Sequence, residues 1–214
     1  MSETATTDIL VELQPQKATV KPGKLFIGGE FVDSASGKVF NTINPATGQI
    51  LTNIAEADAN DVDRAVKAAS AAFEEGSPWR KMNSVDRTRC LLKLADLIRA
   101  NAEELSELET LDTGKPIFES SKFDIPQAAE CFEYYAGWVT KITGETIPVS
   151  KGGDAFAYTL REPIGVCGQI IPWNFPLQML SWKVAPALAC GNTIVLKPAE
   201  QTPLTALRFA ELTL

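Results

Sequence analysis

Two short apolar runs in the last third of the chain, joined by a helical stretch, constrain the fold most strongly. The first run covers residues 166–171 and ends at Pro172, and the second covers residues 193–196. Runs of this length without polar alternation are typical of strands buried in a parallel sheet. A further helix is expected after Thr202 and Pro203, an N-cap and first-turn pair. The order strand, helix, strand, helix predicts an α/β fold.

The loops that follow these two strands are the expected ligand site. Parallel sheets bind ligands at the carboxyl ends of their strands, so the loops after Ile171 and Leu196 would lie side by side. Neither loop contains a GxGxxG or GxxxxGK[ST] pattern. Phosphate binding by the usual glycine turns is therefore not indicated.

The part of the chain before these strands predicts a small β region followed by helices. Gly28 and Gly29 suit a two-residue hairpin turn, which requires positive φ. Apolar residues at helical spacing predict one helix that ends at Gly76, one that starts after Ser84, and one that ends at Gly114. A fourth helix is expected over residues 126–141.

Charge and hydropathy exclude several classes of protein. The formal net charge of −7 argues against a nucleic-acid or acidic-membrane partner. No apolar run approaches the roughly 20 residues that span a bilayer, and the acidic start of the sequence lacks the features of a signal peptide. We therefore expect a cytoplasmic protein without a membrane or nucleic-acid partner.

The sequence contains no histidine, which excludes every Ser-His, Cys-His or histidine-base arrangement. Its cysteines are widely spaced and form no CxxC pair, so metal binding by thiolates is not indicated. We expect them to be reduced and mostly buried. They are Cys90, Cys131, Cys167 and Cys190.

Seven segments together resemble the aldehyde dehydrogenase superfamily, in its cytosolic, mitochondrial, and retinal or betaine aldehyde branch. Read in order, they are FIGGEFV, NPATGQIL, GSPWR, LDTGKP, YYAGW, EPIGVCGQIIPWNFP and LKPAEQTPLTAL. The resemblance implies the N-terminal portion of that fold: a truncated Rossmann-like parallel sheet with N-terminal helices and a partial oligomerisation arm.

This resemblance divides the chain into four expected parts. Residues 1–24 are expected to be a mobile tail, and residues 25–142 the N-terminal half of the NAD-binding domain. Residues 143–162 would form the partial arm, and residues 163–214 the start of the Rossmann-like sheet. A separate catalytic domain is expected to be absent from this chain.

Asn174 is the residue to which the resemblance gives a direct chemical role. Its side-chain NH₂ would donate to the substrate oxygen and stabilise the oxyanion of a tetrahedral intermediate. The alternative is that Asn174 is only a helix N-cap before Phe175 and Pro176. The preceding residues would line the dinucleotide groove, although their side chains could equally be simple core. They are Ile170, Ile171, Pro172 and Trp173.

Lys197 and Glu200 match the family positions that meet the adenosine ribose. A carboxylate there can accept hydrogen bonds from both ribose hydroxyls, and it would repel the 2′-phosphate of NADP. The resemblance therefore implies NAD as the cofactor, with NADP disfavoured. The alternative is two solvated charges just past a strand.

A monovalent-cation site built from oxygen ligands is also implied by the resemblance. Its members would be Thr42, Ile43, Asp112 and Gln201. Asp112 also makes sense as a turn residue near Gly114.

The family reaction oxidises an aldehyde to a carboxylic acid with NAD, and it needs a nucleophilic cysteine and an activating glutamate. Both are expected beyond Leu214, so this chain by itself is expected to be inactive. The alternative function is a non-catalytic, truncated subunit that binds NAD or associates with full-length subunits. The full-length enzyme would be a homodimer or homotetramer, and the identity of its aldehyde does not follow from these residues.

Overall fold

The computed structural model describes residues 18–150 and 153–214. Strands β7 (Val166–Ile170) and β8 (Thr193–Lys197) pair in parallel, with Ile170 opposite Lys197. Helix α7 (Pro176–Ala189) connects them, and α8 (Leu204–Glu211) follows β8. The predicted α/β order is therefore confirmed, and both strands point their carboxyl ends at the same edge.

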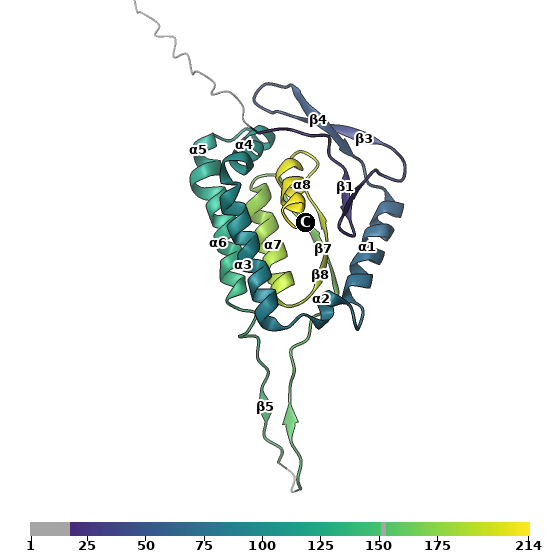
Figure 1. Cartoon of the computed structure of the whole chain (residues 1–214), viewed down its shortest axis with the longest axis vertical. Helices are drawn as coiled ribbons and strands as arrows, with labels where there is room; N and C mark the ends of the chain where they lie inside the picture. Colours follow the sequence, from purple (N-terminus) through teal and green to yellow (C-terminus); the bar gives the residue numbers. More distant parts are fainter. Residues whose placement is uncertain (1–17, 151–152) are drawn as a thin grey trace, which may run out of the picture.

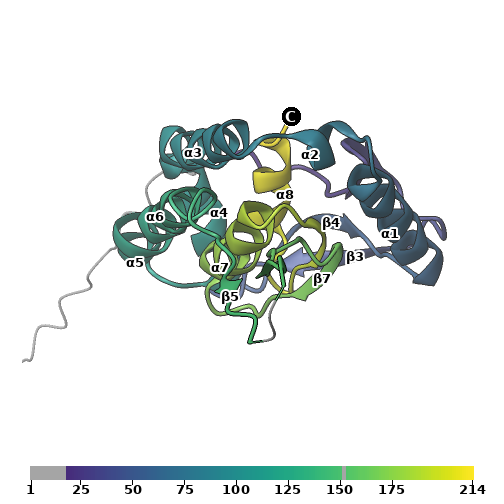
Figure 2. The ribbon, with the colours of Figure 1, turned by 90° about the horizontal axis from the view of Figure 1, so that it is seen from below.

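Helices cover this pair of strands from two sides. Helix α1 (Ala59–Phe73) packs against β7 and β8, on the side away from α7 (Figures 1 and 2). On the α7 side, α6 (Ile125–Ala136) packs between α7 and α3 (Ser84–Ala100). The main apolar core lies between these three helices and is centred on the fully buried Phe132.

Short elements lead into the central helices. Helix α2 (Pro78–Lys81) lies between α1 and α3, and α4 (Ala102–Thr113) follows α3. The chain then passes through α5 (Ile117–Glu119) and the π-helical turn η1 (Ser120–Asp124) into α6. Helix α4 ends at Gly114 with a φ of 74°, as the sequence predicted.

Two antiparallel hairpins form the N-terminal β region. Strands β1 (Leu25–Ile27) and β2 (Glu30–Val32) are joined by Gly28 and Gly29, whose φ values are 64° and 87°. This confirms the predicted two-residue turn, and positive φ at both positions is the pattern of a type I′ turn. Strands β3 (Val39–Ile43) and β4 (Ile50–Ala55) form the second hairpin.

Several helix ends differ from the sequence prediction. Helix α1 stops at Phe73 rather than at Gly76, and the N-cap of α3 is Asn83, whose side chain accepts from the Asp86 amide. Helix α8 begins only at Leu204, because the Leu204 amide donates to the side chain of Asp112 on α4. A partner distant in sequence thus replaces the local cap that Thr202 was expected to supply.

The expected N-terminal tail is only partly within the described residues. Residues 1–17 lie outside them, whereas residues 18–24 pack on the body of the protein. Ala18 is buried in an apolar cluster with Ile54 and Leu204, and the Gly23 amide donates to the Asn53 carbonyl at 2.9 Å. The ordered chain therefore begins before Leu25, because these residues have apolar and backbone partners that local composition does not reveal.

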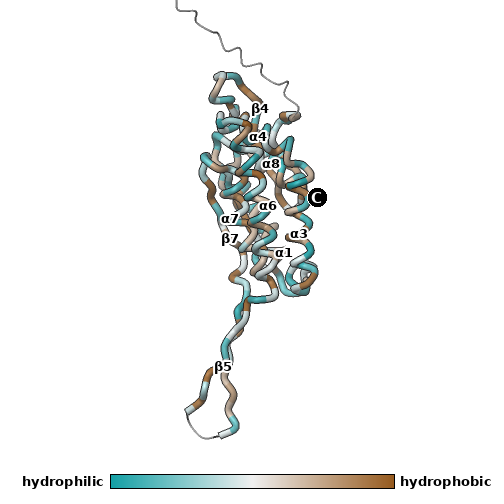
Figure 3. The backbone as a smooth tube through the Cα atoms, turned by 90° about the vertical axis from the view of Figure 1, so that its left-hand side faces the viewer, coloured by the Kyte–Doolittle hydropathy of each residue, from teal (hydrophilic) through white to brown (hydrophobic). Residues whose placement is uncertain are grey.

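The segment that the sequence assigned to an arm extends from one end of the body as a narrow ribbon (Figures 1 and 3). Its strands β5 (Thr146–Ile147) and β6 (Ala157–Tyr158) pair antiparallel. Phe156 and Leu160 are largely exposed on it. In the part of the chain that is described, no helix combines the length and the hydropathy that crossing a membrane requires.

Candidate functional site

The predicted groove residues lie at the carboxyl ends of β7 and β8. The Ile171 amide donates to the Lys197 carbonyl at 3.2 Å, so the loop after β7 starts directly beside the end of β8. Ile170 is 75% exposed and Trp173 is 59% exposed, whereas Ile171 is buried. The alternative that these side chains are simple core therefore fits Ile171 and fails for Ile170 and Trp173.

Asn174 lies in the loop between β7 and α7 with its side chain exposed. The N-cap of α7 is Phe175, and no side chain of the described residues caps this helix. Among the described residues, none forms a hydrogen bond with the Asn174 amide group. The interpretation of Asn174 as a helix N-cap is therefore wrong, and its NH₂ group is available to a ligand.

A buried charge pair lies directly beneath Asn174. The Lys115 Nζ atom donates to the Asn174 backbone oxygen at 2.9 Å and to Asp124 Oδ2 at 2.5 Å. The Lys115 side chain is 11% exposed, and that of Asp124 is 4% exposed. The same ammonium lies 4.3 Å from the centre of the Phe175 ring, a cation–π contact. One lysine thus contacts two consecutive residues of the loop.

Glu109 is a second buried acid at the same loop. Both of its carboxylate oxygens lie 3.4 Å from the Leu177 amide in the first turn of α7, where backbone N–H groups lack helical partners. Burial raises the pKa of Glu109 from 4.5 to about 7, although the nearby Lys115 opposes that rise. Asp124 adds to it by charge repulsion. Glu109 therefore takes up a proton near neutral pH.

The raised pKa of Glu109 predicts a pH-dependent stability. An acid whose pKa is higher in the folded state stabilises the fold fully below its unfolded value of 4.5, and this contribution disappears as the pH rises through about 7. Glu109→Gln removes the ionisation. When the pH is raised from 5 to 8, the free energy of unfolding of the wild type should fall by about 2–3 kcal/mol more than that of the variant. Urea unfolding at both pH values measures this change, and an equal stability difference at both would contradict it.

Lys197 and Glu200 lie together at the end of β8. The Lys197 Nζ atom is 3.3 Å from the Glu200 Oε1 atom, and both side chains are more than half exposed. Exposed pairs of this kind contribute little to stability, so both groups can reorient toward a ligand at little cost. Lys197 is the last residue of β8, opposite Ile170, and Glu200 lies in the turn that follows, so both are at the edge of the sheet from which the Asn174 loop also starts.

Three of the four predicted cation ligands also come together. The buried Thr42 hydroxyl donates to Asp112 Oδ1 at 3.2 Å and lies 3.5 Å from the Gln201 carbonyl oxygen. Asp112 lies buried in the last turn of α4, so the alternative interpretation of Asp112 as a turn residue near Gly114 is wrong. Ile43 follows Thr42 on β3, with its side chain exposed. The described residues include no cluster of three or more His, Cys, Asp or Glu side chains that could hold a metal.

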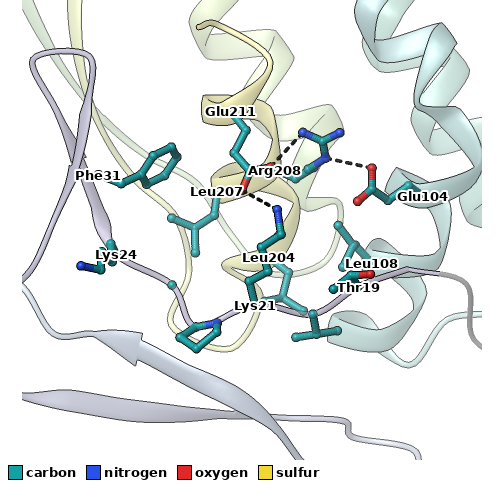
Figure 4. Close-up of a pocket in the computed structure, with 13 residues that line it drawn as sticks. Thr19, Lys21, Lys24, Phe31, Glu104, Leu108, Leu204, Leu207, Arg208 and Glu211 are labelled. Carbon is teal, nitrogen blue, oxygen red and sulfur yellow. Dashed lines mark hydrogen bonds and ion pairs between the residues drawn. The ribbon is translucent and has the colours of Figure 1, made fainter.

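A separate pocket lies between residues 19–24 and helix α8, and none of the predicted site residues lines it (Figure 4). Each of its charged groups already has an ion-pair partner, and for Lys24 that partner is Asp33 outside the pocket. Arg208 lies 2.9 Å from both Glu104 and Glu211, and Lys21 lies 3.5 Å from Glu211. The pair of Lys21 and Glu211 joins residues 19–24 to α8. This indicates that the charged groups of the pocket have a structural role.

Comparison with known proteins now decides the family. A family model described as the aldehyde dehydrogenase family matches residues 31–214. The chain belongs to the aldehyde dehydrogenase family. The match includes the Asn174 loop and both β7 and β8.

Relatives and solved structures agree with this assignment. The chain is 60% identical over 183 residues to "Aldehyde dehydrogenase family 2 member B4, mitochondrial" of Arabidopsis thaliana, covering 86% of this chain and 34% of that protein. It is 54% identical over 197 residues to "Aldehyde dehydrogenase, mitochondrial" of Homo sapiens, covering 92% and 38%. The structure titled as the NAD⁺ complex of aldehyde dehydrogenase from Bacillus cereus matches with a TM-score of 0.88 and 53% identity, over 94% of this chain and 41% of that one. This aldehyde dehydrogenase chain thus spans 34–41% of the length of these compared proteins.

The cysteines of this aldehyde dehydrogenase chain differ from the sequence expectation. Cys90 and Cys190 are exposed, and Cys131 and Cys167 are only partly buried. The expectation of mostly buried thiols was wrong because Cys90 lies on the solvent side of α3 and Cys190 lies at the C-cap of α7. Cys190 is therefore at the end of α7 opposite to Asn174. Burial raises the pKa of the Cys131 thiol.

The sequence analysis missed Glu109 and Lys115 as members of the site. A signal for Glu109 was present, because it lies on the same helical stripe as Leu105, Leu108 and Asp112, all of which are buried on α4. An acid on a buried stripe indicates a specific partner. Lys115 stood within the LDTGKP segment without a role, and no local pattern connects it to a residue 59 positions later.

Proposed function

We propose that this chain supplies the cofactor-binding and oxyanion-stabilising residues of an NAD-dependent aldehyde dehydrogenase. The observation that carries the proposal is the position of Asn174. Its unpartnered side-chain amide lies in the loop after β7, while Lys197 and Glu200 lie at the end of the adjacent strand. A neutral amide donor there can stabilise the negative charge that develops on the aldehyde oxygen, beside the residues proposed to hold NAD.

The residues at this edge suit the two ends of NAD. Lys197 and Glu200 would hold the adenosine ribose, and residues 170–173 would line the groove, with the exposed Trp173 as its largest apolar surface. When bound, NAD supplies the hydride acceptor. Asn174 would donate to the aldehyde oxygen as negative charge develops there. The overall reaction converts an aldehyde, NAD⁺ and water into a carboxylate, NADH and two protons.

We also propose that the nucleophilic cysteine and the activating glutamate are not among residues 1–214, so that the chain alone is inactive. Support comes from Cys190, which lies at the far end of α7 from Asn174, and from Cys131, whose thiol pKa is raised by burial. Further proposals are the four-part division of the chain, the monovalent-cation site, and assembly into a homodimer or homotetramer through the arm. A cytoplasmic location stays a prediction, since several compared relatives are named mitochondrial.

The test is the reaction itself, measured with the protein as its natural source produces it. With a panel of aliphatic and aromatic aldehydes and NAD, the carboxylic acid and NADH should appear in a one-to-one ratio. NADH is followed by its absorbance and the acid by chromatography. A protein that binds NAD but oxidises no aldehyde in this panel would favour the alternative function of a non-catalytic, cofactor-binding subunit.

The choice between NAD and NADP is predicted to depend on Glu200. Glu200→Ser removes the carboxylate that would lie against a 2′-phosphate and leaves Lys197 to attract it. We expect kcat/KM for NADP to rise about tenfold and that for NAD to fall by a similar factor, as one exposed charge contact implies. Glu30→Ser is the matched control, because Glu30 is an exposed residue of β2. An unchanged NAD-to-NADP ratio in the Glu200 variant would remove Glu200 from the cofactor site.

A further inference from the structure

The loop that carries Asn174 is anchored from below by Lys115, a residue just past the C-terminus of α4. Its ammonium donates to the Asn174 backbone oxygen at 2.9 Å and to Asp124 at 2.5 Å, and it lies 4.3 Å from the centre of the Phe175 ring. These contacts use two of the three donors of the ammonium on named oxygens. The anchor thus joins α4, the turn before α6, and the loop between β7 and α7.

Burial makes this anchor costly as a stability device. The Lys115 and Asp124 side chains are 11% and 4% exposed, so both charges have lost most of their water. The attraction within a buried ion pair often only balances the cost of desolvating it. The pair therefore adds little net stability, yet its ammonium donates to the Asn174 carbonyl. This indicates that the pair holds the loop between β7 and α7 in position.

This anchor fixes the backbone from which the Asn174 side chain projects. The Asn174 amide group has no hydrogen-bond partner in residues 18–150 and 153–214, so the conformation of the loop backbone sets where the side chain starts and which rotamers it can adopt. Lys115 donates to the carbonyl of Asn174 itself, and its contact with the Phe175 ring holds the next residue. One side chain therefore contacts both residues that the peptide bond after Asn174 joins.

We propose that Lys115 is a positioning residue for Asn174, which keeps the loop in the conformation that aims the amide donor at the substrate oxygen. The proposal rests on the function proposed above. Lys115 does not touch the reacting atoms, and Asp124 holds its ammonium in place. Misplacement of a catalytic donor by about 1 Å can lower a rate about 100-fold, so loss of the anchor should be visible in turnover.

The test is a double-mutant cycle, with the substitutions made in the protein of the length that its natural source produces. Lys115→Met should lower kcat about 10- to 100-fold and leave KM for NAD within about twofold. In the Asn174→Ala background, the same substitution should lower kcat less than about threefold, because the group that Lys115 positions is already absent. An equal loss in both backgrounds, or no loss in a folded Lys115→Met protein, would overturn the proposal.

A milder variant covers the case in which Lys115→Met does not fold. Asp124→Asn keeps the volume and removes the charge that holds the ammonium. It should lower kcat in the wild-type background and not in the Asn174→Ala background. Arg99→Met is the matched control, because it breaks an ion pair with Glu133 on α6 that does not touch the loop. It should leave kcat unchanged.

Hydrogen exchange separates this proposal from the function on which it rests. In Lys115→Met or Asp124→Asn, amides of residues 173–179 should exchange at least about tenfold faster, with α3 unchanged. If the wild type oxidises no aldehyde, the proposed function fails, and this exchange still decides whether Lys115 holds the loop. Unchanged exchange at the loop would show that it does not.

Discussion

Replacing Asn174 with alanine should lower kcat for aldehyde oxidation about 100- to 1,000-fold, the effect expected when one oxyanion donor is lost. KM for NAD should change little, because the proposed contacts to the ribose come from Lys197 and Glu200 and not from Asn174. Steady-state kinetics at saturating NAD measure both parameters. This is the largest effect that we expect from a single substitution in the site.

The stability of the Asn174→Ala protein distinguishes this role from a structural one. The Asn174 side chain caps no helix and forms no hydrogen bond with the described residues. Its removal should therefore change the free energy of unfolding by less than about 0.5 kcal/mol. Asn83→Ala is the matched control, because Asn83 caps α3. It should cost about 1 kcal/mol and leave kcat intact. An Asn174→Ala protein with normal turnover and reduced stability would contradict the assignment.

Replacing Phe132 with alanine should be the most destabilising substitution in the described core. The side chain is fully buried on α6, between α3 and α7, and its ring stacks on Phe209 with centroids 5.5 Å apart. Loss of a buried phenylalanine typically costs about 3–5 kcal/mol, because it removes apolar contacts and leaves a cavity. Thermal unfolding should shift downward by about 10 °C.

An exposed phenylalanine provides the comparison. Phe118 on α5 has the same side chain, is 60% exposed, and contacts the ring of Phe123 edge-on. Phe118→Ala should cost less than about 1 kcal/mol. If both variants lost the same stability, the core would not be centred on Phe132.

Local patterns in the sequence predicted the elements whose cause is local. The pair Gly28 and Gly29 predicted the first hairpin because glycine readily adopts the positive φ that two-residue hairpin turns require. Gly114 predicted the end of α4, and the apolar runs predicted β7 and β8 to within one residue at each end. The carboxyl ends of those strands then located the edge at which Asn174 and Glu200 lie.

Features that depend on distant partners were not predictable in this way. Ala18 belongs to the body because Ile54 and Leu204 bury it, and the start of α8 is set by Asp112 on α4. The support of the Asn174 loop by Lys115 likewise joins segments 59 positions apart. Each of these contacts follows from the packing of helices on strands, which a periodicity argument does not supply.

A crystal structure of the protein as its natural source produces it, with NAD bound, tests the central claim most directly. We predict the adenosine ribose hydroxyls within hydrogen-bond distance of Lys197 and Glu200, and the nicotinamide end directed toward the loop of Asn174. NAD bound at another edge of the protein, or a nicotinamide directed away from Asn174, would contradict the account.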